Sequence, residues 1–160
     1  MQTEFQVIST CGNLWLGGSD INEDLFQYFA DKFSVQAPDH RAMTERDVAA
    51  LRKAVESIKE QFTGAEEVPI RLNFDGFTLK DKMSRAQFAQ LITPRLQQTF
   101  ELVKSVLQES HIPEERIKDI LLVGGSTKIP VSALFTMRMF MLKRYVLGGR
   151  ESAESALSAC

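Results

Sequence analysis

Apolar residues recur every three or four positions along two stretches of the chain, and this spacing predicts two amphipathic helices. The first helix begins near Asp20, which together with Glu23 three residues later resembles a capping box. Its apolar stripe consists of Ile21, Leu25, Phe29 and Phe33. Thr44 and Asp47 cap the second helix, and Gly64 ends it. Its apolar stripe consists of Val48, Leu51, Val55, Ile58 and Phe62.

After the second helix, residues 68–74 alternate between apolar and polar side chains, which predicts a strand. Asp75-Gly76 follows and suits a two-residue type I′ turn. A hairpin closed by this turn pairs Phe74 with Phe77 and Leu72 with Leu79. One side of the hairpin is then apolar, and this side must lie on helices because an isolated hairpin is only marginally stable.

Two further segments predict strands. Residues 5–10 and 14–16 flank a turn signal at residues 11–13, and together they predict a second hairpin. Residues 120–123 form a continuous apolar run, which is typical of a strand buried on both faces. Gly124 and Gly125 end this strand, and residues 126–130 lead into another expected helix.

A proline divides the region that follows the hairpin at Asp75-Gly76. Ser84 and Gln87 open a third helix, which we expect to end before Pro94 because an interior proline costs about 3 kcal/mol. Thr93 would then cap a fourth helix, with Pro94 at its first position. This fourth helix runs to about residue 110 and turns four side chains inward, namely Leu96, Phe100, Val103 and Leu107.

The last thirty residues differ from the rest, because they combine several methionines with Arg138, Lys143 and Arg144 and end in small residues. We expect a helix to about residue 146 and a disordered tail at residues 148–160. The mixture of basic and apolar side chains leaves a membrane-surface helix or a partner-binding helix as an alternative.

Composition and charge exclude several classes of protein. The chain has 160 residues, 44% of them hydrophobic and 25% charged, which is ordinary for one globular domain. Its net charge of −2 gives no basic surplus, so we expect neither nucleic acid nor a membrane as a main partner. No secretory signal is visible, and Cys11 and Cys160 are expected to be reduced thiols. We therefore expect a cytoplasmic location and leave an organellar one open.

Few residues offer catalytic chemistry. The chain has two histidines, His40 and His111, and neither lies in a Gly-x-Ser-x-Gly or Cys-His context. The sequence shows no His/Cys cluster with metal-ligand spacing and no Gly-x-x-x-x-Gly-Lys-[Ser/Thr] phosphate loop. An independent small hydrolase is therefore not expected.

Two features could contact a ligand. At residues 120–130 a strand, two glycines and a helix start follow one another, so the backbone could approach a phosphate closely; a plain tight turn is the alternative. On the second helix, four polar residues recur at 4-3-4 spacing beside the apolar stripe: Arg52, Glu56, Lys59 and Thr63. The alternative for this flank is a solvated surface with a Glu56–Lys59 ion pair.

These segments together resemble the 70-kilodalton heat-shock chaperone family. Residues 5–21, which include Leu-Gly-Gly-Ser-Asp-Ile, are similar to a hairpin of that family and its Leu-Gly-Gly-x-Asp-Phe motif. Residues 51–63 resemble its adenosine-contacting helix. Residues 122–130, Leu-Val-Gly-Gly-Ser-Thr-Lys-Ile-Pro, resemble a late motif usually written with Arg where Lys128 stands. The resemblance covers residues 4–131 and stops after Pro130.

The resemblance implies an α+β or α/β architecture, specifically part of one lobe of an actin-like ATPase domain. Residues 1–33 and 118–147 would form a partial inner subdomain of the second lobe. Residues 34–117 would form its outer subdomain of helices and a β-hairpin, and residues 148–160 would be the tail.

The resemblance also implies a nucleotide site for ATP or ADP, accompanied by Mg²⁺ in an intact family member; we expect no metal ligand in this chain. The implied nucleotide-binding residues are Gly17, Gly18, Glu56, Lys59, Thr63, Gly124, Gly125, Ser126 and Lys128. Many family members carry Arg at the position of Glu60, which implies weaker adenosine binding here.

The same comparison implies that this polypeptide does not hydrolyse ATP by itself. The family's phosphate loops, Asp-x-Gly-Thr-Thr and Asp-x-Gly-Gly-Gly-Thr, do not occur in the sequence, and its catalytic Lys and Glu would lie upstream of Met1. Phosphoryl transfer depends on positioning and on charge stabilisation by metal and donors, which these elements supply. The alternative function is a non-enzymatic interaction module that docks nucleotide-exchange factors or co-chaperones.

Overall fold

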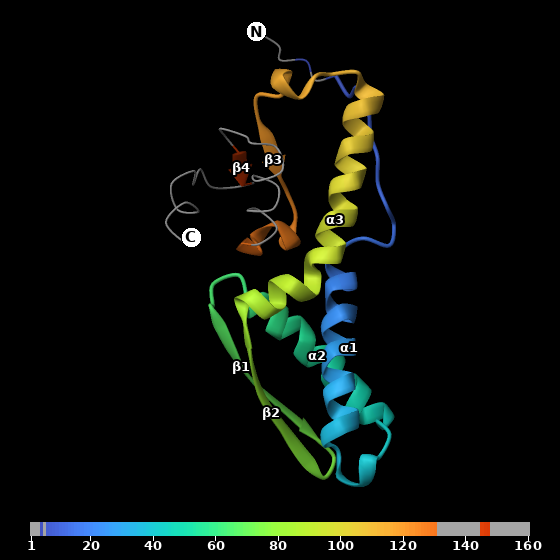
Figure 1. The fold of residues 1–160 in the computed structure, drawn as a ribbon, viewed down its shortest axis with the longest axis vertical. Helices are drawn as coiled ribbons and strands as arrows, with labels where there is room; N and C mark the ends of the chain where they lie inside the picture. The colour runs from blue at the N-terminus through green and yellow to red at the C-terminus, as the bar shows by residue number, and fades with distance from the viewer. Residues whose placement is uncertain (1–3, 5, 131–144, 148–160) are drawn as a thin grey trace.

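In the part of the chain that the structure describes, three helices and a two-stranded antiparallel hairpin surround one core, with a second small sheet beside them (Figure 1). The computed structural model describes residue 4, residues 6–130 and residues 145–147. The helices are α1 (Gly18–Gln36), α2 (Glu45–Gln61) and α3 (Arg85–Ser110), and the short helical turns are η1 (Pro38–His40), η2 (Glu114–Arg116) and η3 (Gly125–Lys128). The strands are β1 (Glu67–Phe74), β2 (Phe77–Ser84), β3 (Ile120–Leu122) and β4 (Tyr145–Leu147).

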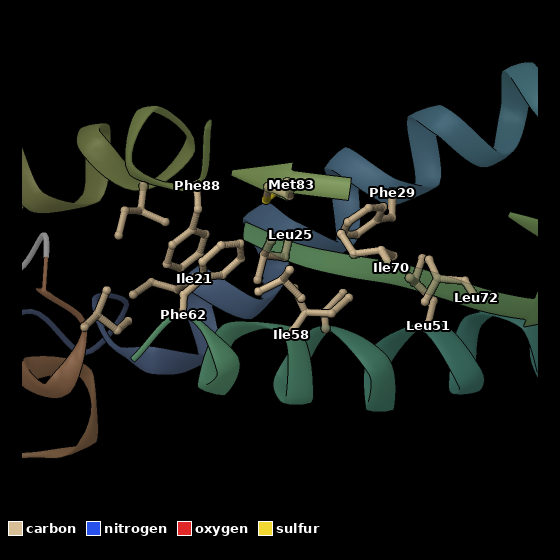
Figure 2. Packing of buried hydrophobic residues seen from close by; sticks show 14 of the residues in the cluster. Ile21, Leu25, Phe29, Leu51, Ile58, Phe62, Ile70, Leu72, Met83 and Phe88 are labelled. Carbon is tan, nitrogen blue, oxygen red and sulfur yellow. The ribbon is translucent and has the colours of Figure 1, made fainter. Parts of the chain in front are cut away.

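The apolar stripes of α1 and α2 are buried as the sequence predicts. Figure 2 shows how side chains of the two helices interlock with those of β1, β2 and the start of α3. Across this core, Phe62 stacks on Phe88 with ring centroids 4.5 Å apart and an interplanar angle of 8°. Val48 is the exception, because it is only half-buried.

The predicted hairpin at Asp75-Gly76 and its register are confirmed. β1 pairs with β2 so that Phe74 lies opposite Phe77 and Leu72 lies opposite Leu79. Gly76 has a φ of 83°, the left-handed conformation that a type I′ turn requires. The apolar side of the hairpin packs on the helices as expected, since Leu72 and Leu79 are in the same core cluster as the apolar stripes of α1 and α2.

A network centred on Asp47 fastens the tip of this hairpin to the start of α2. The Asp47 side chain is 2% exposed, and its Oδ2 accepts from Arg41 Nη1 at 2.6 Å and from Thr44 N–H at 3.0 Å. Its Oδ1 accepts from the backbone N–H of Asp75 at 3.2 Å. Arg41 Nη2 donates to the Asp75 carbonyl at 2.6 Å, and the Arg41 guanidinium lies 5.0 Å from the centroid of the Phe33 ring.

The first helix starts earlier than the sequence suggests. Gly17 is its N-cap, and the Asp20 carboxylate accepts a 2.7 Å hydrogen bond from the Gly17 N–H. Asp20 is therefore the third helical residue and not the first cap, so the predicted capping box with Glu23 is wrong. Glu23 instead accepts from Arg52 at 2.9 Å, which joins α1 to α2.

The predicted break before Pro94 is also wrong, because α3 continues through it. Pro94 has no N–H to donate to the carbonyl of Gln90, four residues earlier, and beside it the Thr93 hydroxyl donates to the Ala89 carbonyl at 2.7 Å. Figure 1 shows that the ribbon of α3 changes direction after its first turns, which is the expected effect of an interior proline. Leu96 is buried, whereas Phe100, Val103 and Leu107 are only half-buried.

The predicted N-terminal hairpin does not form within residues 6–16, which contain no strand. The Asn13 side chain accepts from the Trp15 N–H at 2.9 Å, and this local turn takes the place of strand pairing. Val7 and Trp15 are 78% and 79% exposed, so no core holds the segment in an extended pair. Ser9 Oγ donates to Glu109 of α3 at 3.2 Å, which places the segment beside that helix (Figure 1).

The strand after residue 119 forms, but it is not buried on both faces. β3 pairs in parallel with β4, and Leu121 and Val123 are 63% and 67% exposed, because the described residues do not cover them. The expectation of a helix that extends to about residue 146 is wrong at its end, since Tyr145–Leu147 is a strand that pairs with β3. The expected helix after Pro130 and the expected tail at residues 148–160 lie outside the described residues.

Candidate functional site

A cavity of about 500 Å³ lies where the first turn of α1, the C-terminal end of α2 and η3 meet. This volume is within the usual range of small-molecule sites. The cavity is lined by Gly18, Lys59, Glu60, Thr63, Gly125, Ser126, Lys128 and Ile129. The lining residues therefore carry two ammonium groups, one carboxylate and two hydroxyl groups.

Buried neighbours position these lining residues. Lys59 follows the buried Ile58 of α2, and Thr63 follows the buried Phe62, which caps the C-terminal end of that helix. Ile129, at the end of η3, is 2% exposed and belongs to the same core cluster as both of them. The glycine-rich turn is thus anchored to the core on which α2 packs.

The backbone of Gly18 approaches the opposite walls closely. Lys59 Nζ donates to the Gly18 carbonyl at 3.1 Å and so ties α2 to α1. A Cβ atom at Gly18 would lie 3.1 Å from Ser126 Oγ and 3.4 Å from Lys59 Nζ. The first of these distances is tighter than ordinary van der Waals contact, so the Ser126 hydroxyl would have to shift by a few tenths of an ångström to admit a Cβ at Gly18.

Gly124 gives the turn before η3 its shape. It is the N-cap of η3 and has a φ of 99°, which residues with a Cβ rarely adopt. The turn is closed by Thr127, whose hydroxyl donates to the Gly124 carbonyl at 2.7 Å.

Six of the nine residues named from the sequence line this cavity: Gly18, Lys59, Thr63, Gly125, Ser126 and Lys128. The other three do not. Gly17 and Gly124 are the N-caps that precede α1 and η3, and Glu56 is exposed on α2 one turn before Lys59. Whether any of the nine binds nucleotide stays a prediction.

The alternative of a Glu56–Lys59 ion pair is not supported, because no such pair occurs among the described residues and Lys59 bonds to Gly18. The structure adds Glu60 and Ile129 to the lining residues. Glu60 could have been found from its position directly after Lys59, in the last turn of α2.

Within the ranges 6–130 and 145–147, no group of three or more His, Cys, Asp or Glu residues is placed to hold a metal ion. In that same part of the chain, no helix has the length and apolar character needed to cross a membrane.

Comparison with known proteins gives the family. The family model described as Hsp70 protein matches residues 2–143, and the chain belongs to this family. The match runs past residue 131, where the resemblance was expected to end. Membership implies an actin-like ATPase fold, with which the helices and the antiparallel hairpin are consistent.

Several chaperones are similar to this chain. A heat shock 70 kDa protein of Penicillium citrinum is 32% identical over 128 residues, which are 79% of this chain and 25% of that protein. A ribosome-associated molecular chaperone of Saccharomyces cerevisiae is 31% identical over the same share of this chain and 21% of its own length. A chaperone protein HscA homolog of Acidovorax sp. (strain JS42) is 32% identical over 81% of this chain and 20% of its own length. The chain thus spans a quarter or less of these relatives.

Proposed function

We propose that this chain is part of the nucleotide-binding domain of an Hsp70 chaperone and binds adenine nucleotide in the cavity between α1, α2 and η3. The observation that carries the proposal is the convergence of three segments, far apart in sequence, on one cavity. They contribute Gly18, Lys59 with Thr63, and Gly125 with Ser126 and Lys128. These are also the segments for which the resemblance implies nucleotide contacts.

The chemistry of the cavity supports a nucleotide as ligand. Lys59 and Lys128 supply positive charge that can offset a phosphate, and the glycine backbone allows close approach. The first N–H groups of α1 point toward its N-terminal end, where an anion is favoured. In this proposal, residues 1–33 and 118–147 belong to the inner subdomain of the second lobe and residues 34–117 to the outer one.

We also propose that this polypeptide contributes nucleoside contacts without hydrolysing ATP. Hydrolysis needs groups that position the γ-phosphate and Mg²⁺, and the two phosphate-loop motifs of the family do not occur in this sequence. In a complete relative, nucleotide would close this lobe over a cleft and thereby control a peptide-binding domain.

Isothermal titration of the 160-residue chain with ADP and Mg²⁺ tests the proposal. Lys59→Met removes the ammonium group and keeps most of the aliphatic stem, and Lys53→Met on the same helix is the matched control because Lys53 is exposed and does not line the cavity. Loss of one charge-assisted hydrogen bond is expected to lower ADP affinity by about tenfold. Lys53→Met is expected to leave it unchanged.

Two results would contradict the proposal. If the wild-type chain is folded by circular dichroism and gives no binding heat with ADP, nucleotide binding is refuted, and docking of nucleotide-exchange factors or co-chaperones becomes the better explanation. Release of inorganic phosphate from ATP by the purified chain would refute the statement on hydrolysis.

A further inference from the structure

A second cavity, of about 490 Å³, lies between α1 and α3. Each helix lines it with four residues at the same spacing, i, i+3, i+4 and i+7, so each set lies on one helix face over two turns, roughly 10 Å. The residues of α1 are Asp24, Gln27, Tyr28 and Asp31, and those of α3 are Leu91, Pro94, Arg95 and Gln98. We call this cavity the α1–α3 groove, and its length corresponds to about three residues of an extended chain.

The α3 side of the groove offers carbon surface beside a free amide. Leu91 is half-buried and Pro94 is exposed, so a ligand can cover both of them. The Gln98 amide has no hydrogen-bond partner among the described residues, and an amide can both donate and accept. This side therefore fits an occupant that combines an aliphatic part with peptide groups.

The α1 side carries a negative charge that no neighbouring cation balances. Asp31 forms no ion pair within the described ranges 6–130 and 145–147. The basic side chains near it are already bound to other carboxylates. Arg95 donates to both oxygens of Asp24, at 2.9 and 3.0 Å, and Lys32 pairs with Asp81.

The groove therefore favours a cation over an anion. Asp20 adds to its negative field, because the pKa of Arg95 is raised by the hydrogen bond with Asp24 and further by the charges of Asp24 and Asp20. Asp31 also keeps acceptor capacity: its Oδ1 accepts from Gln27 at 2.7 Å, and a carboxylate has about four lone-pair sites.

We propose that the α1–α3 groove docks a basic segment of another polypeptide, in which an arginine pairs with Asp31 and lays its aliphatic stem on Leu91 and Pro94. Arginine suits both halves of the groove, because its stem is buried on apolar surface while its head stays charged. Its planar guanidinium also matches a carboxylate better than an ammonium group does. The inference does not rest on the proposed nucleotide function, since the two cavities share no lining residue.

An NMR titration of the isotopically labelled 160-residue chain with the peptide acetyl-Leu-Arg-Leu-amide tests the inference. Saturable shifts are expected at the backbone amides of Gln27, Asp31 and Gln98. The same peptide with citrulline in place of arginine keeps the shape without the charge, and it is expected to bind about threefold more weakly or worse.

Two variants test the role of the carboxylate. Asp31→Asn keeps an acceptor for Gln27 and is expected to weaken the arginine peptide by about threefold. Glu45→Gln is the matched control, because it also removes one exposed negative charge but lies in the first turn of α2 and does not line the groove. This control is expected to leave the affinity unchanged.

Several results would overturn the inference. They are equal binding of the arginine and citrulline peptides, unchanged affinity in a folded Asp31→Asn variant, and the absence of saturable shifts in the groove. An equal loss in Glu45→Gln would also overturn it, because only the net charge of the chain would then attract the peptide. None of these results bears on ADP binding in the other cavity.

Discussion

Replacing Asp47 with asparagine is expected to destabilise the fold more than any ordinary surface substitution. The Asp47 carboxylate is buried, and four hydrogen bonds reach it from Arg41, from the Thr44 N–H and hydroxyl groups, and from the Asp75 N–H. Removing one partner of a buried ion pair costs about 3–5 kcal/mol of unfolding free energy. Arg41 keeps 28% of its side-chain surface exposed and can be partly rehydrated, so we expect the lower end, about 3 kcal/mol.

The pH dependence gives the same prediction a second readout. The Arg41 guanidinium and the hydrogen bonds from Thr44 and Asp75 hold the pKa of Asp47 well below its usual range. A carboxyl whose pKa is lowered by folding contributes stability above its unfolded pKa, about 3.9, and loses that contribution as the pH falls below this value. Wild-type stability should therefore fall in acid more steeply than that of Asp47→Asn, and the difference between them should shrink.

Urea unfolding followed by circular dichroism, near neutral pH and again near pH 3, measures both effects. Asp39→Asn is the control, because Asp39 is exposed in a neighbouring turn and asparagine also tolerates its left-handed φ of 52°. This variant is expected to stay within about 0.5 kcal/mol of wild type. A loss of less than about 1 kcal/mol for Asp47→Asn, with an unchanged acid slope, would refute the buried-pair reasoning.

Two further predictions concern the walls of the cavity. Gly18→Ala places a Cβ 3.1 Å from Ser126 Oγ, so ADP affinity in calorimetry should fall severalfold, whereas urea unfolding should change by less than about 1 kcal/mol because alanine is the better helix former. Unchanged ADP affinity would show that the close approach is unimportant. Ile129→Ala removes a buried side chain and should cost about 2–5 kcal/mol in urea unfolding; a loss near zero would show that η3 is not anchored to the core.

Local signals predicted the elements of this fold well, and long-range contacts explain the failures. The hairpin register followed from Asp75-Gly76, and the start of α2 followed from Thr44 and Asp47, because turns and caps involve neighbours in sequence. Nothing in that spacing indicates that Asp47 also binds Arg41 and the hairpin tip. Such contacts depend on how the elements pack.

The N-terminal segment and the helix at Pro94 show the same limit. Strand propensity at residues 5–10 predicted a hairpin, but pairing requires a partner and a covered face, and Val7 remains exposed. Pro94 predicted a helix end on a local rule, yet α3 continues because its first turns pack Phe88 and Ile92 into the core. Packing therefore outweighed propensity at this position.

For the site, periodicity placed the right face of α2 but not which of its turns reaches the cavity. Glu56, Lys59 and Thr63 share a flank, so the sequence could not tell which of its turns meets the ligand. The cavity lies at the C-terminal end of α2, where Lys59, Glu60 and Thr63 line it and Glu56 does not. The cavity lies at this end of α2 because Ile129 packs in the core there and brings the glycine-rich turn beside it.

The positions of the residues that line the cavity consequently depend on the packing of the core. Phe62 immediately precedes Thr63 and stacks on Phe88 of α3, so the end of α2 beside the cavity is fixed by an aromatic pair that does not itself line the cavity. The buried Ile129 likewise fixes the position of Lys128, the residue before it. Because close-packed interiors transmit displacements, changes in these buried side chains must move the lining groups. Ligand affinity and fold stability should therefore vary together for core substitutions and separately for substitutions at Glu60 or Lys59.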